Sequence, residues 1–128
     1  MLATLEVQKA IYEKLTSYGL AVYDTLPINT PLPYVQMIGI RIRDAHTKSM
    51  RRQIYTVSLT AWCIDTTSIN IHTMCNTVLQ LADEELLLDG EYSHDSTRLE
   101  YINFIKEEYN TEILNQAILE FEIEVSKN

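Results

Sequence analysis

The most informative stretch for the fold is TPLPYVQMIGIRIRDAHTKSMRRQIYTVSLTAW, residues 30–62. From Gln53 to Ile64 apolar and polar residues alternate, and this pattern predicts a strand that is buried on one face only. Another strand is expected from Tyr34 to about Arg43, joined to the first by a basic connection without glycine. The residues predicted to face the core from the later strand are Tyr55, Val57, Leu59, Ala61 and Cys63.

The chain before this stretch predicts a helix and a loop. Residues 4–18 carry apolar side chains at helical spacing, with Thr4 as the expected N-cap and Gly19 as the expected end. The segment LAVYD, residues 20–24, is a candidate short strand. Three prolines within residues 25–33 then predict an extended loop, because proline continues neither a helix nor a central strand.

The chain after this stretch predicts one helix and two more strands. Thr66 or Thr67 is the expected cap of the helix, and Asp89-Gly90 signals a turn after it. Strands are expected from Thr97 to about Glu107 and from Leu114 to Val125. The predicted core face of the helix comprises Ile71, Cys75, Val78, Leu79 and Ala82; that of the last strand comprises Ala117, Leu119, Phe121, Ile123 and Val125.

These elements predict an α+β fold. We expect one two-layer domain over residues 1–128, with a mainly antiparallel sheet of about four long strands covered on one face by two helices. A chain of 128 residues is long enough for one sizeable core. No apolar run reaches the roughly 18 residues that span a bilayer, and the N-terminus lacks a signal-peptide pattern, so we expect a soluble protein made in a cytoplasm, with no membrane partner.

Charge is distributed unevenly along the chain. The net charge is −8, and 13 of the 18 acidic residues lie at or after Asp83. A basic segment stands against this background, with one acid, Asp44, among five cations: Arg41, Arg43, Lys48, Arg51 and Arg52. The segment is interpreted as a protein-docking arm, as a solvated loop, or less readily as a nucleic-acid patch, since it lacks interleaved aromatic residues.

The sequence contains no pattern typical of catalysis. Cys63, His72 and Cys75 match no common zinc spacing, and no glycine-rich phosphate loop or nucleophile elbow is present, so no cofactor or metal is predicted. Two further histidines, His46 and His94, are expected in surface connections. A row of carboxylates, Glu120, Glu122 and Glu124, alternates along the last strand. An acid–base pair or magnesium site is conceivable there, but a solvated sheet face is the favoured interpretation.

Several segments resemble the tail terminator (tail completion) proteins of long-tailed phages. They are the N-terminal helix, VYDTLPINTPLPYVQMIGI, the basic connection, the strand end LTAWCID, the helix opening TTSINIHTMCNTVLQL and the final AILEFEIEV. The resemblance spans nearly the whole chain. It implies a non-enzymatic virion protein that forms a ring, typically a hexamer, at the head-proximal end of the tail tube.

The resemblance also implies partners: other copies of the chain, the tail tube protein and the head–tail connector, with DNA passing through the ring without specific binding. In such an assembly the basic arm would dock onto a neighbour, and the acidic row could face the lumen. Two alternatives stay open. One is a head-completion or connector adaptor of the phage neck, and the other is a small cytoplasmic enzyme.

Overall fold

The computed structural model describes residues 1–65 and 69–128. In chain order the elements are α1 (Thr4–Ser17), β1 (Val22–Tyr23), β2 (Tyr34–Asp44), β3 (Arg51–Asp65), α2 (Ile69–Val78), the 3-10 helix η1 (Leu79–Ala82), β4 (Tyr92–Tyr109) and β5 (Glu112–Lys127). The α+β prediction is confirmed. The expected caps of the second helix, Thr66 and Thr67, lie outside the described residues.

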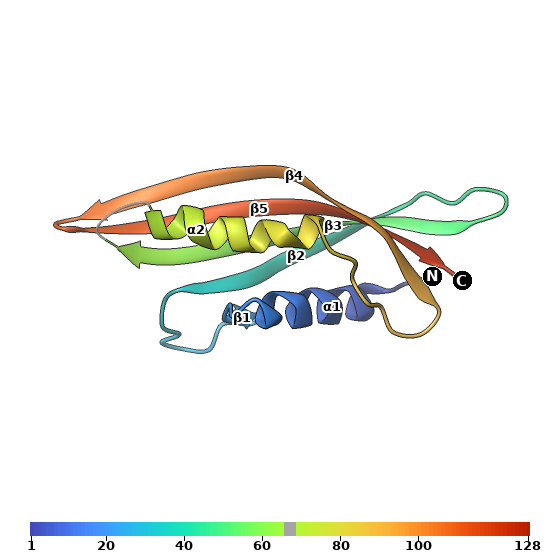
Figure 1. Cartoon of the computed structure of the whole chain (residues 1–128), viewed down its shortest axis with the longest axis horizontal. Coiled ribbons are helices and arrows are strands. Elements are labelled where there is room, and N and C mark those ends of the chain that lie inside the picture. The colour runs from blue at the N-terminus through green and yellow to red at the C-terminus, as the bar shows by residue number, and fades with distance from the viewer. Residues whose placement is uncertain (66–68) are drawn as a thin grey trace.

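The strands form one five-stranded sheet in the order β1-β2-β3-β5-β4. All pairings are antiparallel except that of β1 with β2, which joins Val22 to Val35 and Tyr23 to Gln36 in parallel. The short β1 accounts for the strand beyond the predicted four long ones. In Figure 1 the long strands run side by side along the molecule, and the β2–β3 hairpin projects at one end.

Both helices pack on one face of this sheet, as predicted (Figure 1). The core lies between the helices and alternate residues of β3 and β5, and every residue predicted for those two strand faces is buried. In the second helix Ile71, Cys75 and Val78 are buried as expected, while Leu79 and Ala82 are partly buried against the core. No helix among the described residues is long and apolar enough to span a membrane.

The start of α1 differs from the prediction. The N-cap is Ala3, not Thr4, and it makes no side-chain capping bond. Instead the Ala3 backbone N–H donates to the Tyr55 hydroxyl at 2.8 Å, so a buried residue of β3 satisfies a donor at this helix terminus. The predicted end is correct, since α1 ends at Ser17 and Gly19 follows with a φ of 88°.

The strands are also longer than predicted. β2 extends to Asp44 and β3 begins at Arg51, so the connection comprises only residues 45–50. The physical reason is that Ile40 and Ile42 continue the core-facing alternation and pack against the core, which holds Arg41 and Arg43 in the strand. β4 begins at Tyr92, which places His94 in a strand and corrects its assignment to a connection.

Candidate functional site: the open sheet face and the basic hairpin

The face of the sheet that carries no helix, here called the open face, is built from the residues between the core positions. Cross-strand pairing sets β2, β3, β5 and β4 residues side by side in rows. One row contains Arg41, Thr56, Glu122 and Arg98, and the next towards the hairpin contains Arg43, Ile54, Glu124 and Ser96. The basic segment and the acidic row, which lie about 80 residues apart in sequence, therefore meet on one surface.

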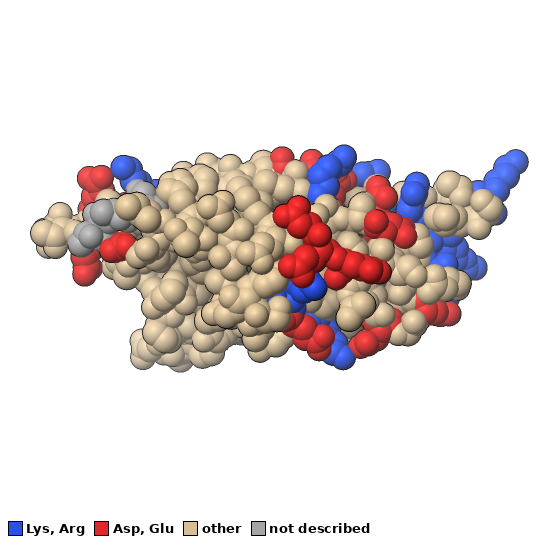
Figure 2. Space-filling view, in the orientation of Figure 1, with Lys and Arg blue, Asp and Glu red and all other residues tan. Residues whose placement is uncertain are grey.

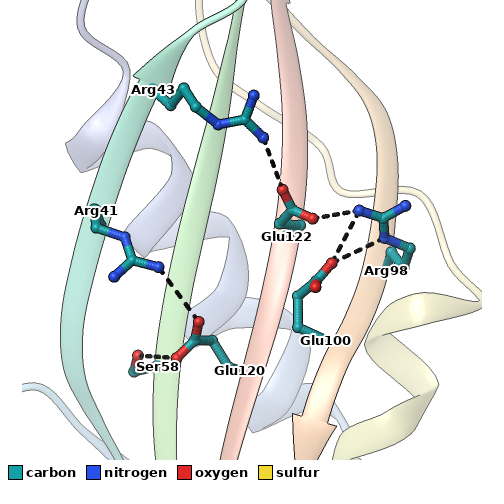
Figure 3. A network of polar contacts seen from close by, with 7 residues as sticks. All are labelled: Arg41, Arg43, Ser58, Arg98, Glu100, Glu120 and Glu122. Carbon is teal, nitrogen blue, oxygen red and sulfur yellow. Dashed lines mark hydrogen bonds and ion pairs between the residues drawn. The ribbon is translucent and has the colours of Figure 1, made fainter.

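Ion pairs connect these rows (Figure 3). Arg41 lies 3.5 Å from Glu120, and Arg43 Nη2 donates to Glu122 Oε1 at 3.1 Å. Glu122 also accepts a hydrogen bond from Arg98, whose Nε donates to Glu100 at 3.0 Å.

Two further contacts extend the network. Ser58 donates to Glu120 at 3.5 Å, and the Arg52 and Glu124 charges lie 3.9 Å apart. The network links β2, β5 and β4 across β3.

The charges in this network are layered. The Arg41 side chain is 79% exposed above Glu120, which is 18% exposed, and Arg43 is 65% exposed above Glu122, which is 15% exposed. The expected solvated carboxylate row is thus largely covered by guanidinium groups. Four arginines (Arg41, Arg43, Arg52 and Arg98) balance four glutamates (Glu100, Glu120, Glu122 and Glu124), so the network itself has no net charge but presents cations outermost.

The network shifts the ionisation of its members. Hydrogen bonding with Glu100, followed by that from Arg98 and Arg43, lowers the pKa of Glu122. Hydrogen bonds to Glu122 and Glu100 raise the pKa of Arg98. Both shifts favour the charged forms of Glu122 and Arg98.

The hairpin tip holds the remaining cations of the basic segment. The connection is ordered by backbone bonds from Ala45 to Arg52 and from Thr47 to Met50, each 2.9 Å, and by His46, whose Nδ1 accepts the Arg52 N–H at 3.1 Å. This agrees with the prediction that His46 lies in a connection. Lys48 and Arg51 make no ion pair with any described residue. Of the five predicted arm residues, these two therefore remain free for a partner, while Arg41, Arg43 and Arg52 are engaged with the glutamate row.

The opposite half of the open face is apolar, which the sequence reasoning missed. Trp62 pairs with Tyr34 and Gln116, and Gln116 pairs with Ile105; the neighbouring rows add Ile118 on one side and Ile64 with Leu114 on the other. Ile64 and Ile105 are each 43% exposed. The signal was present in the even-numbered residues of β3, which change from Thr56, Ser58 and Thr60 to Trp62 and Ile64. We name Tyr34, Trp62, Ile64, Ile105, Leu114 and Ile118 the apolar patch.

Cys63, His72 and Cys75, which were considered for metal binding, are buried or lie against an aromatic ring. Cys63 and Cys75 are buried free cysteines, and burial raises the pKa of Cys75 to about 11, which disfavours the thiolate needed for ligation or nucleophilic attack. The His72 ring lies against Phe104, with ring centroids 4.6 Å apart and planes tilted by 46°. Within residues 1–65 and 69–128 no group of three or more His, Cys, Asp or Glu side chains is arranged to hold a metal ion.

Comparison with known proteins relates the fold to one solved assembly. No protein-family model matches the chain, and no curated protein matches it either. A chain in a structure described as the virion of a native gene transfer agent (GTA) particle is similar with a TM-score of 0.78. The similarity covers 97% of each chain at 18% sequence identity. At this identity the similarity establishes a shared fold.

Proposed function

We propose that this protein is a structural virion subunit, and specifically a tail terminator that forms a hexameric ring at the head-proximal end of a phage tail tube. The observation that carries the proposal is the fold similarity to a chain of a GTA virion along 97% of both chains. The full-length resemblance in sequence pattern supports the finer assignment. In this role the protein stops tube polymerisation, provides the head–tail joining surface and catalyses no reaction.

The hairpin tip is proposed to dock onto an acidic surface of the tail tube. Lys48 and Arg51 are the cations of the basic segment that lack an ion-pair partner among the described residues, and the hairpin projects beyond the rest of the sheet (Figure 1). Charges on a projecting tip approach a partner first, so they contribute to the rate and orientation of docking.

DNA is proposed to pass through the ring without specific binding. The reason is the chain's net charge of −8, which opposes phosphate, rather than the row Glu120, Glu122 and Glu124 alone, because arginines cover two of these carboxylates. The acidic row is therefore a weaker candidate for the lumen surface than its sequence pattern indicates.

Electron microscopy with purified tail tubes tests the proposal. Wild-type protein should collect at one end of each tube, and the double variant Lys48→Glu/Arg51→Glu should fold normally but no longer collect there. The matched control is Lys9→Glu, which reverses an exposed cation of α1 and changes the net charge by the same amount as Lys48→Glu alone. Tubes that remain bare with wild-type protein contradict the terminator role. Cross-linking to the connector under those conditions would favour the head-completion adaptor.

A further inference from the structure

The apolar patch is an uncovered part of the sheet. Both helices pack on the opposite face, so no described helix shields Trp62, Ile64 or Ile105. Charged side chains are absent from its central rows, Tyr34–Trp62–Gln116–Ile105 and Gln36–Thr60–Ile118–Asn103, and Glu107 borders it at the tip of the β4–β5 hairpin. Exposed apolar surface that is bordered by charged residues marks an interaction site.

The helices at the same end carry no charged residue on the other side of the sheet. The segment Ile69–Ala82, which forms α2 and η1, contains no charged residue, although 22% of the chain is charged. Figure 2 shows a broad uncharged region on this side, with a few charged groups at the tip beyond it and more charged groups on its other side. Interface centres are depleted of charge in the same way. For a chain with a net charge of −8, an uncharged surface is also where two copies can approach without repulsion.

The helix side and the open face also carry opposite charges beside their uncharged regions. Asp83, Glu84 and Glu85 follow η1 directly and are exposed, with Glu84 paired to Lys14 at 2.7 Å, and Figure 2 shows carboxylates gathered near the middle of the helix side. On the open face, the exposed guanidinium groups of Arg41, Arg43 and Arg98 lie next to the apolar patch. On each side a charged region thus follows the uncharged one, with carboxylates next to it on the helix side and exposed guanidinium groups next to it on the open face.

We propose that a second copy of this chain covers the open face, with its α2 on the apolar patch and its Asp83–Glu85 run opposite the exposed arginines. The contact is front-to-back, so each copy uses two different surfaces, and repetition with a closing rotation gives a ring. The proposal rests on the proposed function only for its expectation of a closed ring.

The size of the open face is consistent with this contact. The 15 residues of β3 span about 50 Å, and the four long strands are about 14 Å wide between their outer axes, which gives about 700 Å². Each partner in a stable complex buries about 800 Å², so the apolar patch alone is too small and the arginine half must be included.

Two variants separate the two surfaces. Ile105→Glu places a carboxylate in the apolar patch at a residue that is 43% exposed, and Asn76→Glu places one on the exposed side of α2. Light scattering should show wild-type assemblies, while each variant alone stays a monomer. An equimolar mixture should form a species of two subunits, because each variant keeps the surface that the other has lost. The control Leu5→Glu, at a 78% exposed residue of α1, should assemble like wild type.

Trp62 reports the contact directly, since it is the single tryptophan and lies in the apolar patch. On assembly its emission should shift to the blue and acrylamide quenching should fall. The proposal is overturned if wild-type protein stays monomeric or if either variant assembles alone. It is also overturned if the mixture stays monomeric, or if assembly leaves the emission and quenching of Trp62 unchanged. If a variant does not fold, Ile118→Glu and Thr73→Glu replace the pair. Assembly through these surfaces without binding to tail tubes would contradict only the proposed function.

Discussion

The two faces of the sheet are made by the same strands and differ in what they do. On the helix side, alternate residues of β3 and β5 are fully buried and carry the core. On the open face the intervening residues form an ion-pair network at one half and the apolar patch at the other. Stability is therefore concentrated on one side, while the other side leaves the apolar patch and the outermost guanidinium groups exposed.

The largest effect is expected from Phe121→Asp on the helix side. Phe121 is 1% exposed, and an unpaired carboxylate buried there costs several kcal/mol against a total stability of about 5–15 kcal/mol. We expect unfolded or aggregated protein by circular dichroism and size-exclusion chromatography. A folded variant with near-native stability would show that this face is not the core.

A smaller loss is expected from Tyr55→Phe, which keeps the ring and removes the hydroxyl. The hydroxyl accepts the Ala3 N–H at 2.8 Å and donates to Gln53 Oε1 at 2.7 Å, so its removal leaves a buried donor without its partner. The expected cost is about 1–3 kcal/mol in urea unfolding. An unchanged free energy of unfolding would mean that water replaces the hydroxyl at the start of α1.

A still smaller, pH-dependent effect is expected at His94, where the helix side meets β4. The His94 Nδ1 accepts the Leu86 N–H at 3.1 Å, and this hydrogen bond requires the neutral ring. Burial lowers the pKa of His94, while Asp95 and Glu85 partly oppose the shift. Because the folded state binds this proton more weakly than the unfolded state, stability is full above about pH 6.5 and falls as the pH drops below it.

The measurement is the urea midpoint between pH 7.5 and 5, compared with that of His94→Asn. Asparagine offers an acceptor near the Nδ1 position and cannot be protonated in this range. The variant should lose this part of the pH dependence. An identical slope in both proteins would assign the effect to other groups.

The smallest effect is expected from Glu122→Gln on the open face. Glu122 interacts with Arg43 and Arg98, and its lowered pKa means that the network stabilises the fold above about pH 4.5 and loses this contribution as the pH falls through the folded-state pKa. Because its arginine partners are exposed, we expect a cost of about 0.5–1 kcal/mol at pH 7 and less in high salt. A loss as large as that from Phe121→Asp would remove the distinction between the two faces.

The class of fold and the core side of the long strands follow from the sequence alone. Period-two alternation identified Tyr55 to Cys63 and Ala117 to Val125 because side chains of a strand point alternately to its two faces. Glycine with its access to positive φ correctly marked the end of α1. The N-cap of that helix was predicted as Thr4 instead of Ala3 because the Ala3 N–H is satisfied by Tyr55, 52 residues away in sequence, and local capping signals contain no such information.

How the candidate functional residues combine depends on the tertiary structure. The basic segment and the glutamate row were predicted as separate features, and strand order β2-β3-β5-β4 brings them together as one charge-balanced network. The same order assembles the apolar patch from four strands, each contributing one or two residues that are unremarkable alone. Strand order and register arise from long-range pairing, which local periodicity does not encode.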